Sequence, residues 1–261
     1  MSETPCLDIR HTLADPDLHL WEHVGTSKRL VVCFSGIGED ADAVPPLEFA
    51  RTATNNGQDH VLYVADPNRQ WLNGPGQIEK IVGHIEKMVR QTGATEIMTL
   101  GHSMGGYSAA IIGDFVKVDV AVCMSPQTSV HPDVVGDENR WLEERSGITE
   151  HRIRSVVDHI VPETEYYVFF GGHYRERRQR DRFPLGDNIK FYILEDLSHR
   201  TPLRMKKEGI LEDVIQQCFA NHPRRVLKTL QQKLKVWRVT RPTRDMRRRA
   251  RWDSQSQEGI A

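Results

Sequence analysis

The chain has 261 residues, enough for one domain with a sizeable core, and its formal net charge is −1. This near-neutral balance gives no overall sign of nucleic-acid binding, and no apolar run approaches the length that spans a bilayer. The charge is unevenly distributed, because twelve Lys and Arg residues lie between Pro223 and Trp252 against Asp245 alone. The sequence therefore indicates an acidic body followed by a basic C-terminal segment.

Apolar runs that alternate with helical periodicity predict the order of elements along the chain. We expect an N-terminal hairpin over residues 7–13 and 18–23. Further strands are expected at residues 30–34, 61–64, 97–100, 118–124, 166–170 and 190–194. Helices are expected at about residues 46–54, 78–89, 107–116 and 203–219. Strands alternating with helices predict an α/β fold with a mostly parallel central sheet and helices on both faces.

Residues 126–165 interrupt this alternation. They are polar and carry turn residues, including Pro132, Gly136, Gly147 and Pro162, so we expect a helical, cap-like insertion over the site. The domain organisation expected from the sequence is therefore one domain over residues 1–220, with this insertion, and a basic extension over residues 221–261.

The location of the protein is expected to be cytoplasmic. The N-terminus has no basic stretch followed by an apolar run, so we expect no signal peptide. The four cysteines are far apart and form no CxxC pair, which favours a reducing compartment over a disulfide framework.

The most informative stretch is Gly101-His102-Ser103-Met104-Gly105-Gly106, between a predicted strand and a predicted helix. A serine between glycines at such a turn resembles the nucleophile elbow of the α/β-hydrolase superfamily. Residues larger than glycine at positions 101 and 105 would collide with neighbouring backbone. The resemblance extends over about residues 7–220 and implies that Ser103 is a catalytic nucleophile.

The histidine that the resemblance implies is His199. Family order is nucleophile, acid, histidine, with the histidine in the loop after the last strand. His199 lies five residues beyond the strand expected at 190–194, and no other histidine has that placement. The alternative is a surface histidine in a turn.

The triad acid departs from the family pattern. Members usually carry an aspartate shortly after the strand that here is expected at 166–170, but this turn has none before Asp181. Glu176 is the nearest carboxylate and is our first candidate, with a salt bridge among arginines as its alternative role. Asp158, Asp181, Glu195 and Asp196 stay open as alternatives.

The oxyanion hole is expected to use two backbone N–H groups. One is that of Met104, directly after the nucleophile, and the other is that of Ile37, in the loop after the strand at 30–34. Ser35 stands where the family usually has histidine. A plain tight turn is the alternative for this loop.

The loop 66–71 follows the strand at 61–64 and therefore lies at the same sheet edge as Ser103. Arg69 is a candidate to bind an anionic group of the substrate and Trp71 to stack on it. A structural loop held by an Asp66–Arg69 pair is the other interpretation. No metal-ligand cluster or phosphate-binding glycine loop is present in the sequence, so we expect no metal and no cofactor.

The resemblance implies a serine hydrolase that cleaves a carboxylic ester or thioester of a small-molecule or acylated substrate. Acyl transfer through the same triad and a non-catalytic binding protein with this fold are the alternatives. The basic segment 223–252 is a candidate contact for a polyanion or an acidic surface; otherwise it is solvated or lies against the acidic body.

Overall fold

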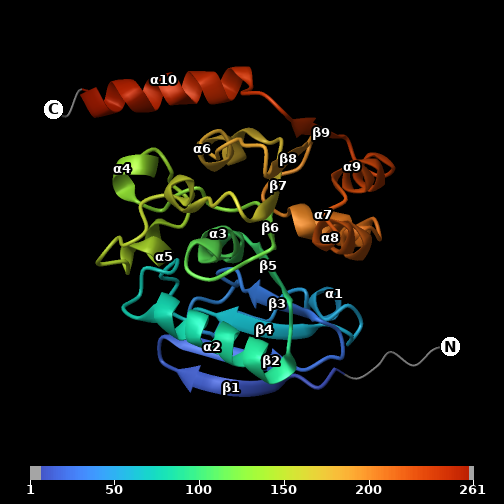
Figure 1. Ribbon diagram of the computed structural model, residues 1–261. Coiled ribbons are helices and arrows are strands. Elements are labelled where there is room, and N and C mark those ends of the chain that lie inside the picture. The colour runs from blue at the N-terminus through green and yellow to red at the C-terminus, as the bar shows by residue number, and fades with distance from the viewer. Residues whose placement is uncertain (1–6, 259–261) are drawn as a thin grey trace.

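The fold is built on one central β-sheet (Figure 1), and the computed structural model describes residues 7–258. In this part of the chain the sheet has nine strands in the order β1-β2-β4-β3-β5-β6-β7-β8-β9. The strands from β4 to β8 pair in parallel, whereas β1, β2 and β9 pair antiparallel with their neighbours. The strands are β1 (Arg10–Asp15), β2 (Leu18–His23), β3 (Arg29–Phe34), β4 (His60–Ala65), β5 (Glu96–His102), β6 (Val120–Met124), β7 (Glu165–Gly171), β8 (Ile189–Leu194) and β9 (Val236–Val239).

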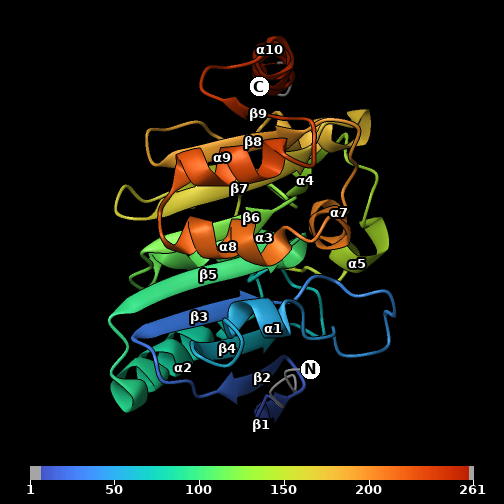
Figure 2. The ribbon, with the colours of Figure 1, turned by 90° about the vertical axis from the view of Figure 1, so that its right-hand side faces the viewer.

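Helices cover both faces of the sheet, as the sequence predicts. The α-helices are α1 (Ala50–Ala53), α2 (Gln77–Thr92), α3 (Met104–Ile111), α4 (Pro132–Val135), α5 (Leu142–Ser146), α6 (Arg177–Arg180), α7 (Thr201–Lys207), α8 (Leu211–Phe219), α9 (Pro223–Gln231) and α10 (Arg244–Glu258). Short 3-10 helices are η1 (Ile112–Asp114), η2 (Val156–His159) and η3 (Tyr174–Glu176). Figure 2 shows α1, α7, α8 and α9 in front of the sheet, and α2 and α3 pack on the opposite face.

The apolar pattern explains why these helices bind the sheet. In α2, buried Ile78, Ile81, Ile85 and Met88 recur at helical spacing and join the same core cluster as β3 and β4. The helix ends where Gly93 adopts a φ of 65°, a conformation that favours glycine.

Two expected helices differ in the structure. The helix expected at 46–54 is only α1, because Pro45 and Pro46 lack an N–H and Phe49 has a φ of 56° before the first helical turn. The helix expected at 203–219 is divided into α7 and α8, because Gly209 between them has a φ of 71°. No helix within residues 7–258 has both the length and the apolar character needed to cross a membrane.

The packed domain continues beyond residue 220. Strand β9 pairs with β8 and forms an edge of the sheet, and α9 buries Val226 and Leu230 completely. Val226, Leu230 and Val236 belong to the same core cluster as β6 and β8. The boundary that the charge distribution suggests therefore falls inside the packed structure.

Helix α10 lies outside the sheet, beyond β9 (Figure 1). Its inner face is bound to the acidic body through Arg249, whose Nη1 is 2.8 Å from Asp137 Oδ2, and through the buried side chain of Met246. Asp253 adds an ion pair with Arg182 at 2.8 Å. The outer face exposes four arginines, which are Arg244, Arg247, Arg248 and Arg251. The basic segment thus lies partly against the protein's own acidic residues and partly toward solvent.

Candidate active site

Ser103 occupies a strained turn between β5 and α3. Its backbone has a φ of 58° and a ψ of −121°, which a non-glycine residue adopts only where the surrounding structure enforces it. A Cβ at Gly101 would lie 2.2 Å from backbone atoms of Gly105, and one at Gly105 would lie 2.2 Å from the carbonyl oxygen of Phe34. Glycine at both positions is therefore what allows the strand, turn and helix to pack this closely.

His199 reaches the serine from the loop after β8. Its Nε2 lies 2.8 Å from Ser103 Oγ, which is hydrogen-bonding distance. The loop is held by His102, whose Nε2 lies 2.9 Å from the backbone carbonyl oxygen of His199. The structure therefore brings together the serine and the histidine that the sequence singles out.

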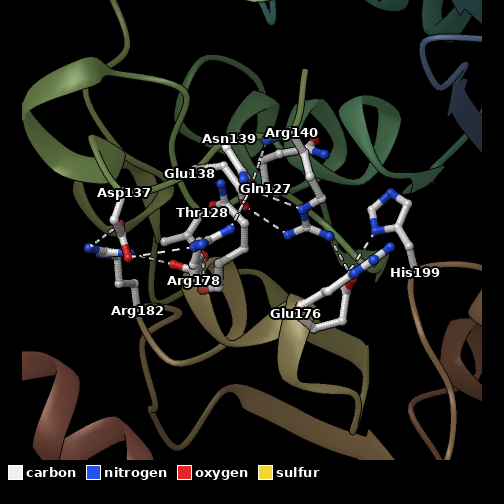
Figure 3. A network of polar contacts seen from close by, with 12 residues as sticks. Gln127, Thr128, Asp137, Glu138, Asn139, Arg140, Glu176, Arg178, Arg182 and His199 are labelled. Carbon is white, nitrogen blue, oxygen red and sulfur yellow. Dashed lines mark hydrogen bonds and ion pairs between the residues drawn. The ribbon is translucent and has the colours of Figure 1, made fainter. Parts of the chain in front are cut away.

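Glu176 approaches the other side of the imidazole from η3, in the turn after β7. Its Oε2 lies 3.3 Å from His199 Nδ1, and its carboxylate is almost completely buried (Figure 3). The competing carboxylates have other surroundings: Asp181 pairs with Arg180 at 2.8 Å, Asp196 with Lys235 at 3.6 Å, and Asp158 is exposed on η2. Of these acids, Glu176 is the one that the structure places against His199.

The protonation states at the site follow from burial and charge. Burial lowers the pKa of His199 below its ordinary value, although the hydrogen bond with Glu176 acts in the opposite direction. Burial alone raises the pKa of Glu176, but the hydrogen bond with His199 and the charge of Arg140 outweigh it and lower that pKa. At neutral pH the imidazole is therefore neutral and the carboxylate ionised, which is the state a general base requires.

Arg140, in the segment between β6 and β7, holds the carboxylate in place. Its Nη1 donates to Glu176 Oε1 at 2.7 Å and its Nη2 to Glu138 Oε2 at 2.8 Å (Figure 3). The guanidinium also stacks 4.3 Å from the ring of Trp141, which lies 5.2 Å from the His199 ring. Sequence reasoning missed Arg140 and Trp141, because the segment 126–165 has no periodicity that predicts where its side chains point.

Gln127 is a further residue that sequence reasoning missed. It is completely buried, and its Nε2 lies 3.0 Å from Ser103 Oγ. Trp71 Nε1 donates to its Oε1 at 3.1 Å. The only sequence signal was position, since Gln127 follows β6 at the edge of the sheet where Ser103 lies.

Arg69 and Trp71, the expected substrate contacts, are both buried and contact the protein itself. Arg69 donates to the backbone carbonyl oxygens of Ile37, Asp40 and Ala43 at 2.8–3.2 Å, which fixes the loop expected to provide an oxyanion donor. The carboxylate of Asp66 accepts hydrogen bonds from the backbone N–H groups of Asn68 and Gln70. The side chains of Asp66 and Arg69 therefore each hold the loop by contacts with backbone groups.

Met104, the expected oxyanion donor directly after the nucleophile, is the first residue of α3. Its N–H therefore lies at a helix N-terminus, where backbone N–H groups favour negative charge. Within residues 7–258 there is no group of three or more His, Cys, Asp or Glu residues arranged to hold a metal ion.

No protein-family model matches the chain, and no curated protein matches it. Solved structures do resemble it. A putative esterase from Staphylococcus aureus is 14% identical with a TM-score of 0.55, over 83% of this chain and 86% of that one. An esterase of Pyrococcus furiosus is 15% identical with a TM-score of 0.50, over 87% of this chain and 93% of that one. The glycosylation-associated Gap123 complex of Streptococcus agalactiae is 12% identical with a TM-score of 0.58, over 82% of this chain but 46% of that one. Together with the strand order, these likenesses show that the chain has the fold of the α/β-hydrolase superfamily.

Proposed function

We propose that the protein is a serine hydrolase that cleaves a carboxylic ester or thioester through an acyl-enzyme on Ser103. The observation that carries this proposal is the distance of 2.8 Å between Ser103 Oγ and His199 Nε2, with Glu176 on the far side of the imidazole. A serine hydroxyl is a poor nucleophile until a base removes its proton, and this geometry supplies that base.

In the first half-reaction, Ser103 Oγ attacks the substrate carbonyl carbon while His199 Nε2 takes the hydroxyl proton. The negative charge that develops on the carbonyl oxygen is stabilised by the N–H groups of Met104 and Ile37. Glu176 stabilises the imidazolium that forms. The imidazolium then gives its proton to the departing alcohol or thiol, and the acyl group remains on Ser103.

In the second half-reaction, His199 removes a proton from water, which attacks the acyl carbon and releases the acid. Ser103 Oγ leaves and regains its proton from His199. An alcohol in place of water gives acyl transfer by the same steps. Two of the solved structures with this fold are described as esterases, so a carboxylic ester is the bond to test first.

A fluorophosphonate probe tests the proposal, because it reacts covalently only with an activated serine. We expect the wild-type protein to be labelled and to hydrolyse short p-nitrophenyl esters, and Ser103→Ala to do neither while remaining folded. Ser146→Ala, which removes an exposed serine hydroxyl on α5, is the matched control and keeps both properties.

The pairing of serine and histidine has its own signature. His199→Ala loses nearly as much ester turnover as Ser103→Ala, and the double variant loses little more, because the two residues act as a unit. A folded wild-type protein that is neither labelled nor active would instead favour the binding-protein alternative.

A further inference from the structure

Beyond the triad, Ser103 Oγ has a second polar neighbour, the side-chain amide of Gln127. From its geometry we infer that Gln127 is a further catalytic residue, which donates a hydrogen bond to the nucleophilic oxygen and is itself oriented by Trp71. This inference rests on the proposed function, because it assigns a role in the reaction of Ser103.

The orientation of the amide follows from its other partner. An indole Nε1–H is a donor with no acceptor capacity, so the group it contacts at 3.1 Å must be the carbonyl oxygen of Gln127. The NH2 group therefore faces Ser103 Oγ at 3.0 Å. Trp71 thus determines which end of the amide the serine meets.

This contact determines the direction of the serine proton. A hydroxyl has one hydrogen and two lone pairs, and one lone pair of Ser103 Oγ accepts from Gln127. The amide has no acceptor directed at the serine, so the hydroxyl hydrogen points to His199 Nε2 at 2.8 Å. His199 must then carry its own proton on Nδ1, facing Glu176. Gln127, acting through Ser103, and Glu176 therefore both favour the neutral His199 tautomer that catalysis needs, with its proton on Nδ1.

The donor also acts on the oxygen during the reaction. As the hydroxyl proton moves to His199, the charge on Ser103 Oγ becomes more negative, and a fixed N–H group stabilises it. When the acyl-enzyme breaks down, the same oxygen is the leaving group, and the same donor stabilises its departure. The contact is available in both half-reactions.

The surrounding structure keeps Gln127 in place. The backbone N–H groups of the next two residues, Thr128 and Ser129, donate to Gln179 Oε1 at 2.7 Å and 3.2 Å. Thr128 Oγ1 donates to the Gln179 backbone oxygen at 2.7 Å. On the other side, Asn73 Nδ2 donates to the backbone oxygen of Trp71 at 2.9 Å. Such support is what a pre-positioned catalytic group requires.

The test uses two substitutions of Gln127 that keep its length. Gln127→Met removes the donor, and we expect fluorophosphonate labelling and kcat to fall on the order of tenfold with KM nearly unchanged. Gln127→Glu replaces the donor with an acceptor that competes with His199 for the serine proton. It should therefore react more slowly than Gln127→Met, although its shape is closer to the native residue.

The role of Trp71 is tested by Trp71→Phe, which keeps an aromatic ring but removes the N–H group. Because Trp71 acts through Gln127, the double variant Trp71→Phe/Gln127→Met should be no slower than Gln127→Met alone. Melting temperatures identify variants that lose activity by unfolding. If Gln127→Met is unfolded, the rate of Gln127→Glu relative to wild type decides the role of Gln127.

The outcomes separate this inference from the proposed function. A wild-type protein that is not labelled overturns the proposed function and this inference together. If the wild type is labelled, and folded Gln127→Met and Gln127→Glu are labelled and turn over ester at the wild-type rate, the hydrolase proposal stands and the role of Gln127 is wrong.

Discussion

The carboxylate of Glu176 lies 3.3 Å from Nδ1 of His199 and is held from behind by Arg140 at 2.7 Å. Glu176 follows β7 and His199 follows β8. Because these two strands are neighbours and pair in parallel, the loops after them lie at the same edge of the sheet and the two side chains can meet. A glutamate, one methylene longer than aspartate, thus spans from the turn to the imidazole. The relationship makes specific predictions about pH and substitution.

Replacing Glu176 by glutamine should lower ester turnover about a thousandfold or more, because an amide cannot stabilise the imidazolium. Wild-type activity should rise with pH through the pKa of His199, which burial places below its ordinary value. Glu176 counteracts part of that shift, so Glu176→Gln should move the rise in activity to still lower pH. Both effects are measured in one pH–rate profile.

The alternative acids provide the controls for this substitution. Asp181→Asn, Asp196→Asn and Asp158→Asn should each keep turnover within a few-fold of wild type, because none of these residues lies against His199 in the structure. A large loss in one of them, with Glu176→Gln still active, would assign the acid elsewhere.

Arg140→Gln should lower both turnover and thermal stability. The substitution removes the cation beside Glu176, so the pKa of that carboxyl rises and its orientation is no longer fixed. It also takes the 2.8 Å ion pair away from buried Glu138 and leaves that carboxylate with only the more distant Arg178 at 3.8 Å, and weakening the pairing of a buried charge is costly. Melting temperature and kcat are the two measurements.

Arg178→Gln is the matched control for Arg140→Gln. Arg178 contacts Asn139 at 2.7 Å and approaches Glu138 at 3.8 Å, whereas the arginine that contacts Glu176 is Arg140. It belongs to the same network (Figure 3) but should leave kcat unchanged. Equal losses of kcat in both folded variants would contradict a specific role for the contact between Arg140 and Glu176.

Much of the fold was predictable because its signals are local. Continuous apolar runs predicted β3 and β6, and the glycines around Ser103 predicted the turn that the structure contains. The position of His199 in the order of elements was enough to select it among the histidines. The roles of Ser103, His199 and Glu176 in a reaction stay predictions until they are tested.

Other features depend on contacts between distant parts of the chain. Gln127 faces Ser103 because Thr128 is fixed by Gln179, 51 residues away in the sequence, and no local pattern encodes that contact. Arg140 reaches Glu176 across 36 residues in the same way. The sequence did not predict β9, because this strand is only four residues long and lies in the basic segment that was expected to be an extension outside the domain.

Deletions should distinguish the two parts of the C-terminal segment. Removal of residues 243–261 takes away α10, whose contacts with the body include exposed or half-buried ion pairs and one buried methionine, so the domain should stay folded with a modestly lower melting temperature. Removal of residues 223–261 also deletes Val226, Leu230 and β9, and it should abolish the cooperative unfolding transition. A folded, active product of the longer deletion would show that α9 and β9 are dispensable.

The outer face of α10 predicts salt-sensitive binding to polyanions. Arg244, Arg247, Arg248 and Arg251 are exposed, so changing all four to glutamine should weaken retention on heparin without altering ester turnover. Changing Arg224, Arg225 and Lys228, which are exposed on α9, to glutamine is the control, because it removes a comparable charge from another surface and should weaken retention less. Equal retention of wild type and the α10 variant at low salt would mean that this face is simply solvated.

Strand β8 depends on residues that are synthesised long after it. All six of its residues are buried, and the strand that pairs with its outer edge, β9, begins more than forty residues later. A growing chain that has reached the end of β8 therefore exposes an unpaired apolar edge until residues 223–239 leave the ribosome. Unpaired edges of this kind are templates for association between chains. The synthesis of residues 223–239 thus determines how long the edge of β8 stays open to pairing with another chain.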